Sequence, residues 1–146
     1  MRYKRKVGKK TIQSKKGVYD GIQFASQLEV YMYKILKDSN IDFGYESERF
    51  DILDGFHSAN VSYERTAKKD FIDRGQKKIR GIYYTPDFVS DLFIIETKGR
   101  ANESFPIRWK LFKRHLHLTD DLRVVYKPQS RADCDVVLKD ILKRFY

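Results

Sequence analysis

The sequence predicts an α/β domain, and three observations lead to that prediction. Three separate segments place apolar residues at helical spacing. Two apolar segments, residues 83–89 and 92–98, meet at a short turn as the strands of a β-hairpin do. Residues 41–84 alternate and turn in a way typical of extended structure, which we interpret as a long polar hairpin. A chain of 146 residues is long enough to form one compact core in residues 18–146, after a basic arm at 1–17.

The first helix is predicted to begin after Ser26, which can cap it, and to end near Asn40. Its apolar stripe consists of Leu28, Tyr31, Met32, Ile35 and Leu36. On a helical wheel Glu29 falls on the edge of this stripe, whereas the other charged residues fall opposite it. Glu29 is therefore the one acid of this helix aimed toward the core boundary. The alternative is a first-turn carboxylate that complements the helix dipole.

The other expected elements follow from the same kinds of pattern. They are a tight hairpin around Asp20-Gly21, a helix over residues 105–118 with Pro106 in its first turn, a short strand over 122–126, and a last helix from Ser130 with Cys134, Leu138, Ile141 and Phe145 on one side.

The hairpin of residues 83–98 carries the most informative side chains. With a turn at Ser90-Asp91, Asp87 faces Ile94 and is the diagonal neighbour of Glu96. Lys98 follows Glu96 on the same face by the period of two. Phe88, Phe93 and Ile95 form the opposite, buried face. Two acids and a lysine are thus expected on one face of the most apolar hairpin in the chain.

This set of side chains suits metal-dependent cleavage of a phosphodiester. Magnesium prefers oxygen ligands, and Asp87 and Glu96 can supply them, with Glu29 completing the set. Lys98 can orient water or stabilise charge on the phosphate. The alternatives are a structural salt-bridge cluster, which would be costly to bury for structure alone, and a glycosidase-like carboxylate pair. The basic balance favours a polyanionic substrate.

Positive charge is unevenly distributed along the chain. Lys and Arg number 30 against 20 Asp and Glu, a net charge of +10, and residues 1–16 contain eight positive residues and no acid. The arm is either a solvated tail or a segment that follows a phosphate backbone, and we favour the second. The expected DNA contacts are Lys4, Arg5, Lys6, Lys9, Lys10, Lys15 and Lys16 in the arm, with Arg100, Lys110, Lys113 and Arg114 on or near the 105–118 helix.

The sequence gives no support for a disulfide-linked protein, a membrane protein, a nucleotide-binding protein or a serine hydrolase. Cys134 is the only cysteine, so no intramolecular disulfide can form. No apolar segment approaches the roughly 20 residues that span a bilayer, and we expect a soluble, cytoplasmic protein without a membrane partner. Neither a Gly-rich phosphate loop nor a serine-hydrolase motif is present, so no nucleotide cofactor is expected.

Four stretches together resemble a known family. They are Leu28-Glu29, Ile41-Asp42-Phe43-Gly44-Tyr45-Glu46, Tyr84-Thr85-Pro86-Asp87-Phe88 and Ile95-Glu96-Thr97-Lys98-Gly99. In this order they resemble the PD-(D/E)XK nuclease superfamily and, more narrowly, the phage endonuclease I family of Holliday-junction resolvases. The resemblance implies a restriction-endonuclease-like central mixed β-sheet flanked by helices. It also implies a phage-encoded, homodimeric DNA-recombination enzyme that acts on branched DNA in the host cytoplasm.

The resemblance further implies a role for each matched residue. Asp87 would bind or bridge two Mg2+ ions, for which Mn2+ should substitute. Glu96 and the Thr97 carbonyl would ligate one ion, and Glu29 would hold the second directly or through water. Lys98 would position the nucleophile.

The chain departs from those resolvases by a longer segment before Asp87, expected to be an extended β-hairpin insertion near residues 56–80. The insertion could replace or block the strand through which resolvase dimers swap, or its basic residues could reach DNA. Two alternatives therefore stay open: a nicking or general DNA endonuclease without branch preference, and a non-catalytic DNA-binding protein of replication or packaging.

Overall fold

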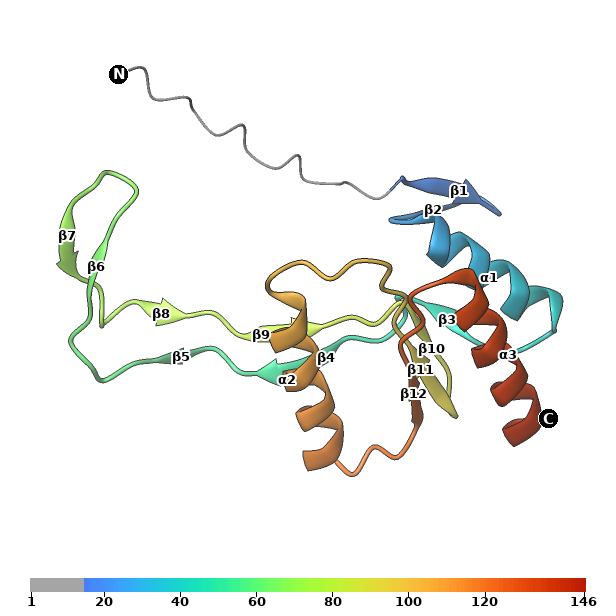
Figure 1. The fold of residues 1–146 in the computed structure, drawn as a ribbon. Coiled ribbons are helices and arrows are strands. Elements are labelled where there is room, and N and C mark those ends of the chain that lie inside the picture. Colours follow the sequence, from blue (N-terminus) through green and yellow to red (C-terminus); the bar gives the residue numbers. More distant parts are fainter. Residues whose placement is uncertain (1–14) are drawn as a thin grey trace, which may run out of the picture.

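The protein consists of an α/β body from which a long β-arm projects (Figure 1). The computed structural model describes residues 15–146. The expected DNA contacts Lys4, Arg5, Lys6, Lys9 and Lys10 lie outside the described residues. No helix in the described part is long and apolar enough to cross a membrane.

A four-stranded sheet forms the centre of the body. Its order is β12 (Val124–Tyr126), β11 (Phe93–Ile95), β10 (Phe88–Val89) and β3 (Gly44–Tyr45). The β11–β12 pair is parallel and the other two pairs are antiparallel. The sheet is therefore mixed.

Three helices cover the two faces of this sheet (Figure 1). On one face α1 (Gln27–Asp38) and α3 (Arg131–Phe145) pack with Phe88 and Ile95 into one core cluster. On the other face α2 (Phe105–Leu118) contributes to a second cluster. The second cluster consists of Phe50, Tyr84, Val89, Ile94, Phe112 and Leu116. A mixed α/β architecture is confirmed, as are the predicted helix positions.

The helix ends follow from local hydrogen bonds. Ser26 caps α1 by accepting from the Glu29 N–H, and Ser130 caps α3 by accepting from the Asp133 N–H, both as predicted. At the start of α2 the Asn102 side chain takes this role, since its Oδ1 accepts from the Phe105 N–H at 2.9 Å. The expected hairpin before α1 consists of β1 (Gly17–Tyr19) and β2 (Ile22–Phe24), joined by the Asp20-Gly21 turn.

The turn between β10 and β11 lies one residue further along than predicted. Phe88 pairs with Ile95 and Val89 with Ile94, so the turn is Asp91-Leu92 and not Ser90-Asp91. The cause is Ser90, whose Oγ accepts from the main-chain N–H groups of Leu92 and Phe93, each at 3.0 Å. Continued by one residue, this register places Asp87 directly opposite Glu96. The predicted pairing of Asp87 with Ile94 was wrong.

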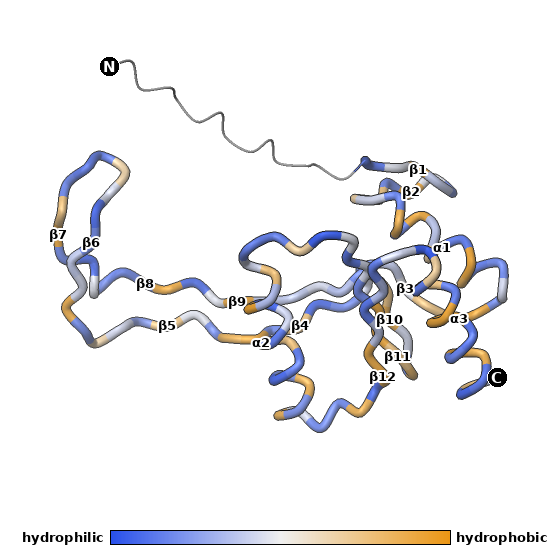
Figure 2. The backbone as a smooth tube through the Cα atoms, in the orientation of Figure 1, coloured by the Kyte–Doolittle hydropathy of each residue, from blue (hydrophilic) through white to orange (hydrophobic). Residues whose placement is uncertain are grey.

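A long antiparallel hairpin, Phe50–Tyr84, leaves the body between β3 and β10, and it is called the β-arm to distinguish it from the basic N-terminal segment. Its three pairs, from base to tip, are β4 (Phe50–Leu53) with β9 (Ile82–Tyr84), β5 (Phe56–His57) with β8 (Lys78–Ile79), and β6 (Tyr63–Arg65) with β7 (Phe71–Asp73). The predicted hairpin is present, and its paired strands extend beyond residues 56–80 to Phe50 and Tyr84. Apolar residues are scattered along the whole arm, where few of them can be buried (Figure 2).

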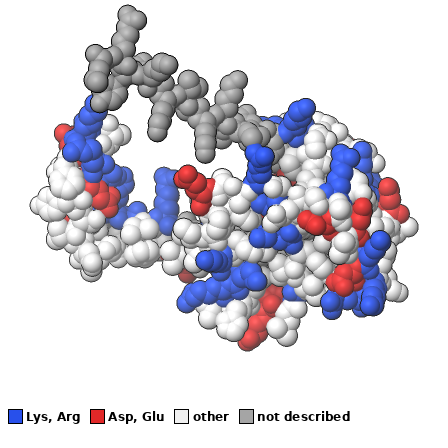
Figure 3. Space-filling model, in the orientation of Figure 1, with Lys and Arg blue, Asp and Glu red and all other residues white. Residues whose placement is uncertain are grey.

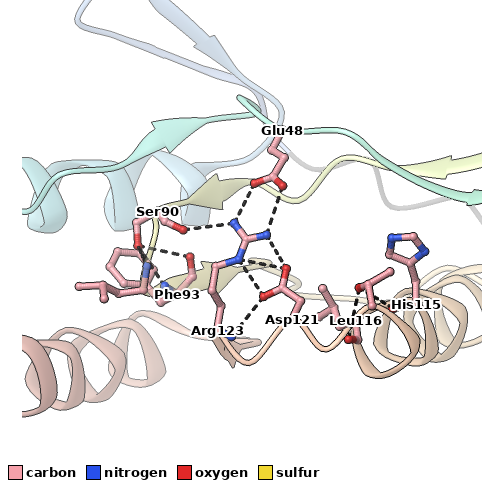
Figure 4. Close-up of polar contacts among 9 residues, drawn as sticks. Glu48, Ser90, Phe93, His115, Leu116, Asp121 and Arg123 are labelled. Atoms are coloured by element: carbon pink, nitrogen blue, oxygen red, sulfur yellow. Dashed lines mark hydrogen bonds and ion pairs between the residues drawn. The ribbon is translucent and has the colours of Figure 1, made fainter.

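Arg123 forms hydrogen bonds with several segments at the end of the sheet where β11 and β12 begin (Figure 4). Its guanidinium donates to Glu48 Oε2 at 2.8 Å, to Asp121 Oδ2 at 2.5 Å and to the Ser90 carbonyl at 3.3 Å. These bonds raise the pKa of Arg123, and they lower the pKa of Asp121. Arg123 therefore joins the loop before β4 to the β10–β11 turn and to β12.

Candidate active site

Asp87 lies at the point where the arm enters the central sheet. Pro86, which is fully buried, separates β9 from β10 and cannot donate to a sheet ladder. The Asp87 carbonyl accepts from the Glu46 N–H at 2.8 Å, which continues the β3–β10 pairing. Its carboxylate Oδ2 accepts from the Thr97 N–H at 2.7 Å and from the Thr97 hydroxyl at 2.6 Å. The side chain is thus fixed to the end of β11.

Glu96 and Lys98 follow β11 on the parallel side of the sheet. Their N–H groups donate to the Tyr126 carbonyl at 3.0 Å and to the Pro128 carbonyl at 2.9 Å. Alternation puts both side chains on the face of Ile94, which is the face covered by α2. Lys98 Nζ accordingly lies 4.8 Å from the centre of the Phe105 ring at the start of α2. The predicted sharing of one face by Asp87, Glu96 and Lys98 agrees with this register.

The two carboxyl groups lie where water is largely excluded. Burial raises the pKa of Asp87 against the opposing effect of the Thr97 hydrogen bonds, and the charge of Glu29 adds to the rise. Burial also raises the pKa of Glu96, and the charge of Asp87 raises it further, whereas Lys98 lowers it. Both acids therefore tend to hold a proton, and a bound cation would reverse that tendency.

One carboxylate oxygen of this pair lacks a partner. Glu96 Oε2 and the Tyr84 hydroxyl are buried near each other, and Tyr84 lowers the pKa of Glu96, yet neither atom forms a hydrogen bond of normal geometry among residues 15–146. Tyr84 stacks on Phe112 of α2 with ring centres 4.5 Å apart, and burial together with the charge of Glu96 raises the pKa of its hydroxyl. Tyr84 borders the site on the face covered by α2, and the sequence analysis did not identify it as a site residue. Its spacing of two from Ile82 indicated only that the two side chains share a face of the strand.

Glu29 is buried as expected, but its oxygens are already engaged. Oε1 accepts from the Ser26 hydroxyl at 2.8 Å, and Oε2 accepts from the Ala25 N–H at 3.2 Å and from the Tyr45 hydroxyl at 2.7 Å. The contacts with Ser26 resemble a capping box, so the first-turn role is present in the structure. Its charge nevertheless raises the pKa of both Asp87 and Glu96. The Tyr45 contact was missed.

The free oxygens of Asp87 and Glu96 suit a magnesium ion that keeps several of its waters. They do not suit an ion enclosed entirely by side-chain ligands. Both hydrogen bonds at Asp87 use Oδ2, which leaves Oδ1 for another ligand, and Glu96 Oε2 is unpartnered. Within the described residues, no three His, Cys, Asp or Glu side chains are grouped to hold an ion. Magnesium commonly binds through one or two carboxylates and keeps several waters, so the pair is sufficient.

The expected DNA contacts in the described range are all solvent-exposed. They are Lys15, Lys16, Arg100, Lys110, Lys113 and Arg114. Figure 3 shows Lys and Arg side chains over the body and on the arm, with few acids between those on the arm. Residues 56–80 of the arm contain seven Lys or Arg against three Asp or Glu. Exposed Lys and Arg side chains are therefore present both on α2 and on the arm.

Comparison with known proteins gives one match. The family model described as DUF1064, protein of unknown function, matches residues 9–131. No curated protein and no solved structure matches the chain. The matched range includes the whole β-arm, Phe50–Tyr84, and all four candidate residues, Glu29, Asp87, Glu96 and Lys98. Because the match covers most of its length, the chain belongs to the DUF1064 family.

Proposed function

We propose that this protein is a metal-dependent DNA endonuclease with a restriction-endonuclease-like fold. One observation carries the proposal: the carboxyl groups of half-buried Asp87 and buried Glu96 lie at the ends of the paired strands β10 and β11 with raised pKa values, beside Lys98. Such an arrangement is unfavourable for stability without a cation. Perturbed acids of this kind mark functional sites more often than structural ones.

The chain's own residues have distinct roles in this reaction. Asp87 Oδ1, Glu96 Oε2 and the Thr97 carbonyl would hold the ion, and Thr97 fixes the Asp87 carboxylate through two hydrogen bonds. When bound, magnesium supplies Lewis-acid stabilisation of charge on the phosphate. Lys98 orients the attacking water and neutralises charge that develops on the phosphate. Glu29 contributes negative charge from α1, and it would hold a second ion through water if one binds.

DNA is the substrate that the charge distribution favours. The net charge of +10 and the exposed basic residues of α2 suit a phosphate backbone. The arm is joined directly to the site, because β9 ends at Tyr84 and only Thr85 and Pro86 separate it from Asp87. Contacts of the arm with DNA would therefore position the phosphate relative to Asp87.

The preferred substrate shape and the assembly state follow from the family resemblance. From that resemblance we propose a Holliday-junction resolvase. Because paired cuts across a four-way junction require two active sites, we also propose a homodimer. Mg2+ is the expected ion, and Mn2+ should substitute for it because both accept oxygen ligands.

A cleavage assay tests the proposal directly. A synthetic four-way junction and a linear duplex of matched sequence are incubated with the protein in Mg2+, Mn2+ or EDTA. Junction cleavage that requires the metal and is abolished in Asp87→Asn supports the resolvase. Asp91→Asn, in the exposed β10–β11 turn, is the matched control. Equal cutting of both substrates indicates a general endonuclease, and binding without cutting indicates a DNA-binding protein.

A further inference from the structure

A hollow of about 290 Å³ adjoins Lys98 on the α2 side of the sheet. Its walls come from residues 98–101, from the first turns of α2 and from the segment that follows β12. Lys98 belongs both to this hollow and to the candidate active site. Anything bound in the hollow would therefore lie next to the reacting phosphate.

Aromatic rings form one side of the hollow. Phe105 and Trp109 lie one helical turn apart with ring centres 6.0 Å apart and planes at 21°. Phe105 is buried, whereas Trp109 keeps part of its surface exposed. The exposed part of Trp109 offers a flat apolar surface of the kind on which nucleobases stack.

Lysines form the rest of the polar lining. Lys127 Nζ lies 5.6 Å from the centre of Trp109 and Lys98 Nζ 4.8 Å from that of Phe105, and Lys110 also borders the hollow. No carboxylate lines it, and none of the three lysines forms a salt bridge within residues 15–146.

A second hollow provides a contrast. It is lined by Tyr33, Phe43 and Tyr45 and has a single lysine, Lys37, which is paired with Asp20. Of these two aromatic-lined hollows, the one beside Lys98 is therefore the one whose lysines form no salt bridge within residues 15–146.

We infer that the hollow beside Lys98 binds one unpaired nucleotide, with its base against Trp109 and its phosphate near Lys127 and Lys98. The size is at the lower end of small-ligand pockets, roughly 300–1,000 Å³, and suits a single base and not a base pair. Stacking on an aromatic ring does not depend on base identity, so no sequence preference is expected.

This inference rests on the proposed function and refines its substrate. A base inside a duplex is stacked between its neighbours and must leave the helix to enter a pocket, which costs least where it is already unpaired. The preferred DNA would thus have an unpaired nucleotide beside the cut, as at a branch point, a flap or a mismatch.

Trp109 makes the inference testable because it is the only tryptophan in the chain. Its fluorescence is followed while Asp87→Asn protein, in EDTA, is titrated with a short oligothymidylate. An abasic strand of equal length supplies the same phosphates without bases, and a blunt duplex supplies stacked bases. Saturable quenching by oligothymidylate, with little by either control, is the expected result. Equal quenching by the abasic strand or by the duplex would overturn the inference, as would no quenching when fluorescence anisotropy of labelled DNA shows full binding.

Two substitutions place the effect in the hollow. Lys127→Ala should weaken the oligothymidylate-dependent quenching severalfold, whereas Lys139→Ala, on the exposed surface of α3, should not change it. Trp109→Leu should weaken single-strand binding measured by anisotropy by about tenfold, as expected when one base no longer stacks on an aromatic ring. Unchanged binding in both Lys127→Ala and Trp109→Leu would contradict the inference. Because these measurements need neither metal nor cleavage, they can fail while the proposed endonuclease activity stands, and the reverse also holds.

Discussion

Thr97 binds one oxygen of Asp87 twice, through its main-chain N–H at 2.7 Å and its hydroxyl at 2.6 Å. The pair joins the end of β11 to the residue before β10, so the two strand ends that carry the acids are held together. Both bonds use Oδ2, so the second oxygen of Asp87 is left for a cation.

Thr97→Val should weaken Mg2+ binding and cleavage by about 10–100-fold, the usual effect of removing a hydrogen bond to a metal ligand. Valine keeps the shape of threonine and the main-chain bond but cannot form the hydroxyl bond. Thr97→Ser keeps the hydroxyl and is the matched control. Calorimetric titration with Mg2+ measures the affinity, and equal affinities for the two variants would contradict the assigned role.

In EDTA the protein should become less stable as the pH rises from about 4 through neutrality. The pKa values of Asp87 and Glu96 are raised in the folded state above their unfolded values of about 4. The stabilising contribution of their protons is complete below the unfolded values and disappears as the pH passes the folded ones. Thermal unfolding at pH 5 and pH 8 measures this change.

The matched variant for the pH experiment is Asp87→Asn combined with Glu96→Gln, which cannot titrate at either position. Its melting temperature should change less between the two pH values. Mg2+ should stabilise the wild type more at pH 8 than at pH 5, because the ion competes with protons. The same pH dependence in both proteins would rule out these two groups as its source.

The β-arm should contribute to DNA affinity without changing the affinity for Mg2+. In Arg74→Gln/Lys77→Gln/Lys78→Gln, the log-log dependence of affinity on salt should become shallower by up to about 0.9 for each phosphate that the variant no longer neutralises. These residues border a hollow on the arm, and the β4–β9 pair separates this hollow from the central sheet. Fluorescence anisotropy at several salt concentrations measures the slope. Lys143→Gln on α3 is the control, and an unchanged slope in the triple variant would exclude the arm from DNA binding.

Arg123→Lys should destabilise the fold by about 1.5–3 kcal/mol, the range for hydrogen bonds to charged groups. Lysine keeps the charge but cannot bond Glu48, Asp121 and the Ser90 carbonyl together (Figure 4). Urea unfolding measures the decrease in stability. Mg2+ affinity should stay the same, because Arg123 lies at the opposite end of the sheet from Glu96. A fall in affinity equal to that of Thr97→Val would argue against this separation.

The sequence predicted the elements best where the determining contacts are local. The helix starts at Ser26 and Ser130 depend on residues three positions away, and the alternation along β11 places Phe93 and Ile95 on the face covered by α1 and α3. The hairpin register was missed because the Ser90 side chain selects the turn, and strand periodicity does not contain that information.

The candidate acids could be located from the sequence, but their partners could not. Asp87 and Glu96 lie on strands that are adjacent in the chain, so alternation alone places them on one face. The contact of Glu29 with Tyr45 joins a helix to a strand 16 residues later, and no periodic pattern links the two. Tyr84 lies near Glu96, whose charge raises its pKa, because the base of the arm packs against α2.

The arm has a length that matters for where DNA would be cut. At about 3.3 Å per residue, the segment from Leu53 to Arg65, which contains β5 and β6, spans at most roughly 40 Å. One turn of duplex DNA measures about 34–36 Å, so a tip resting on one groove would leave the body over the same side of the helix one turn away. Distance from a structural landmark, and not base sequence, would then select the phosphate that reaches Asp87.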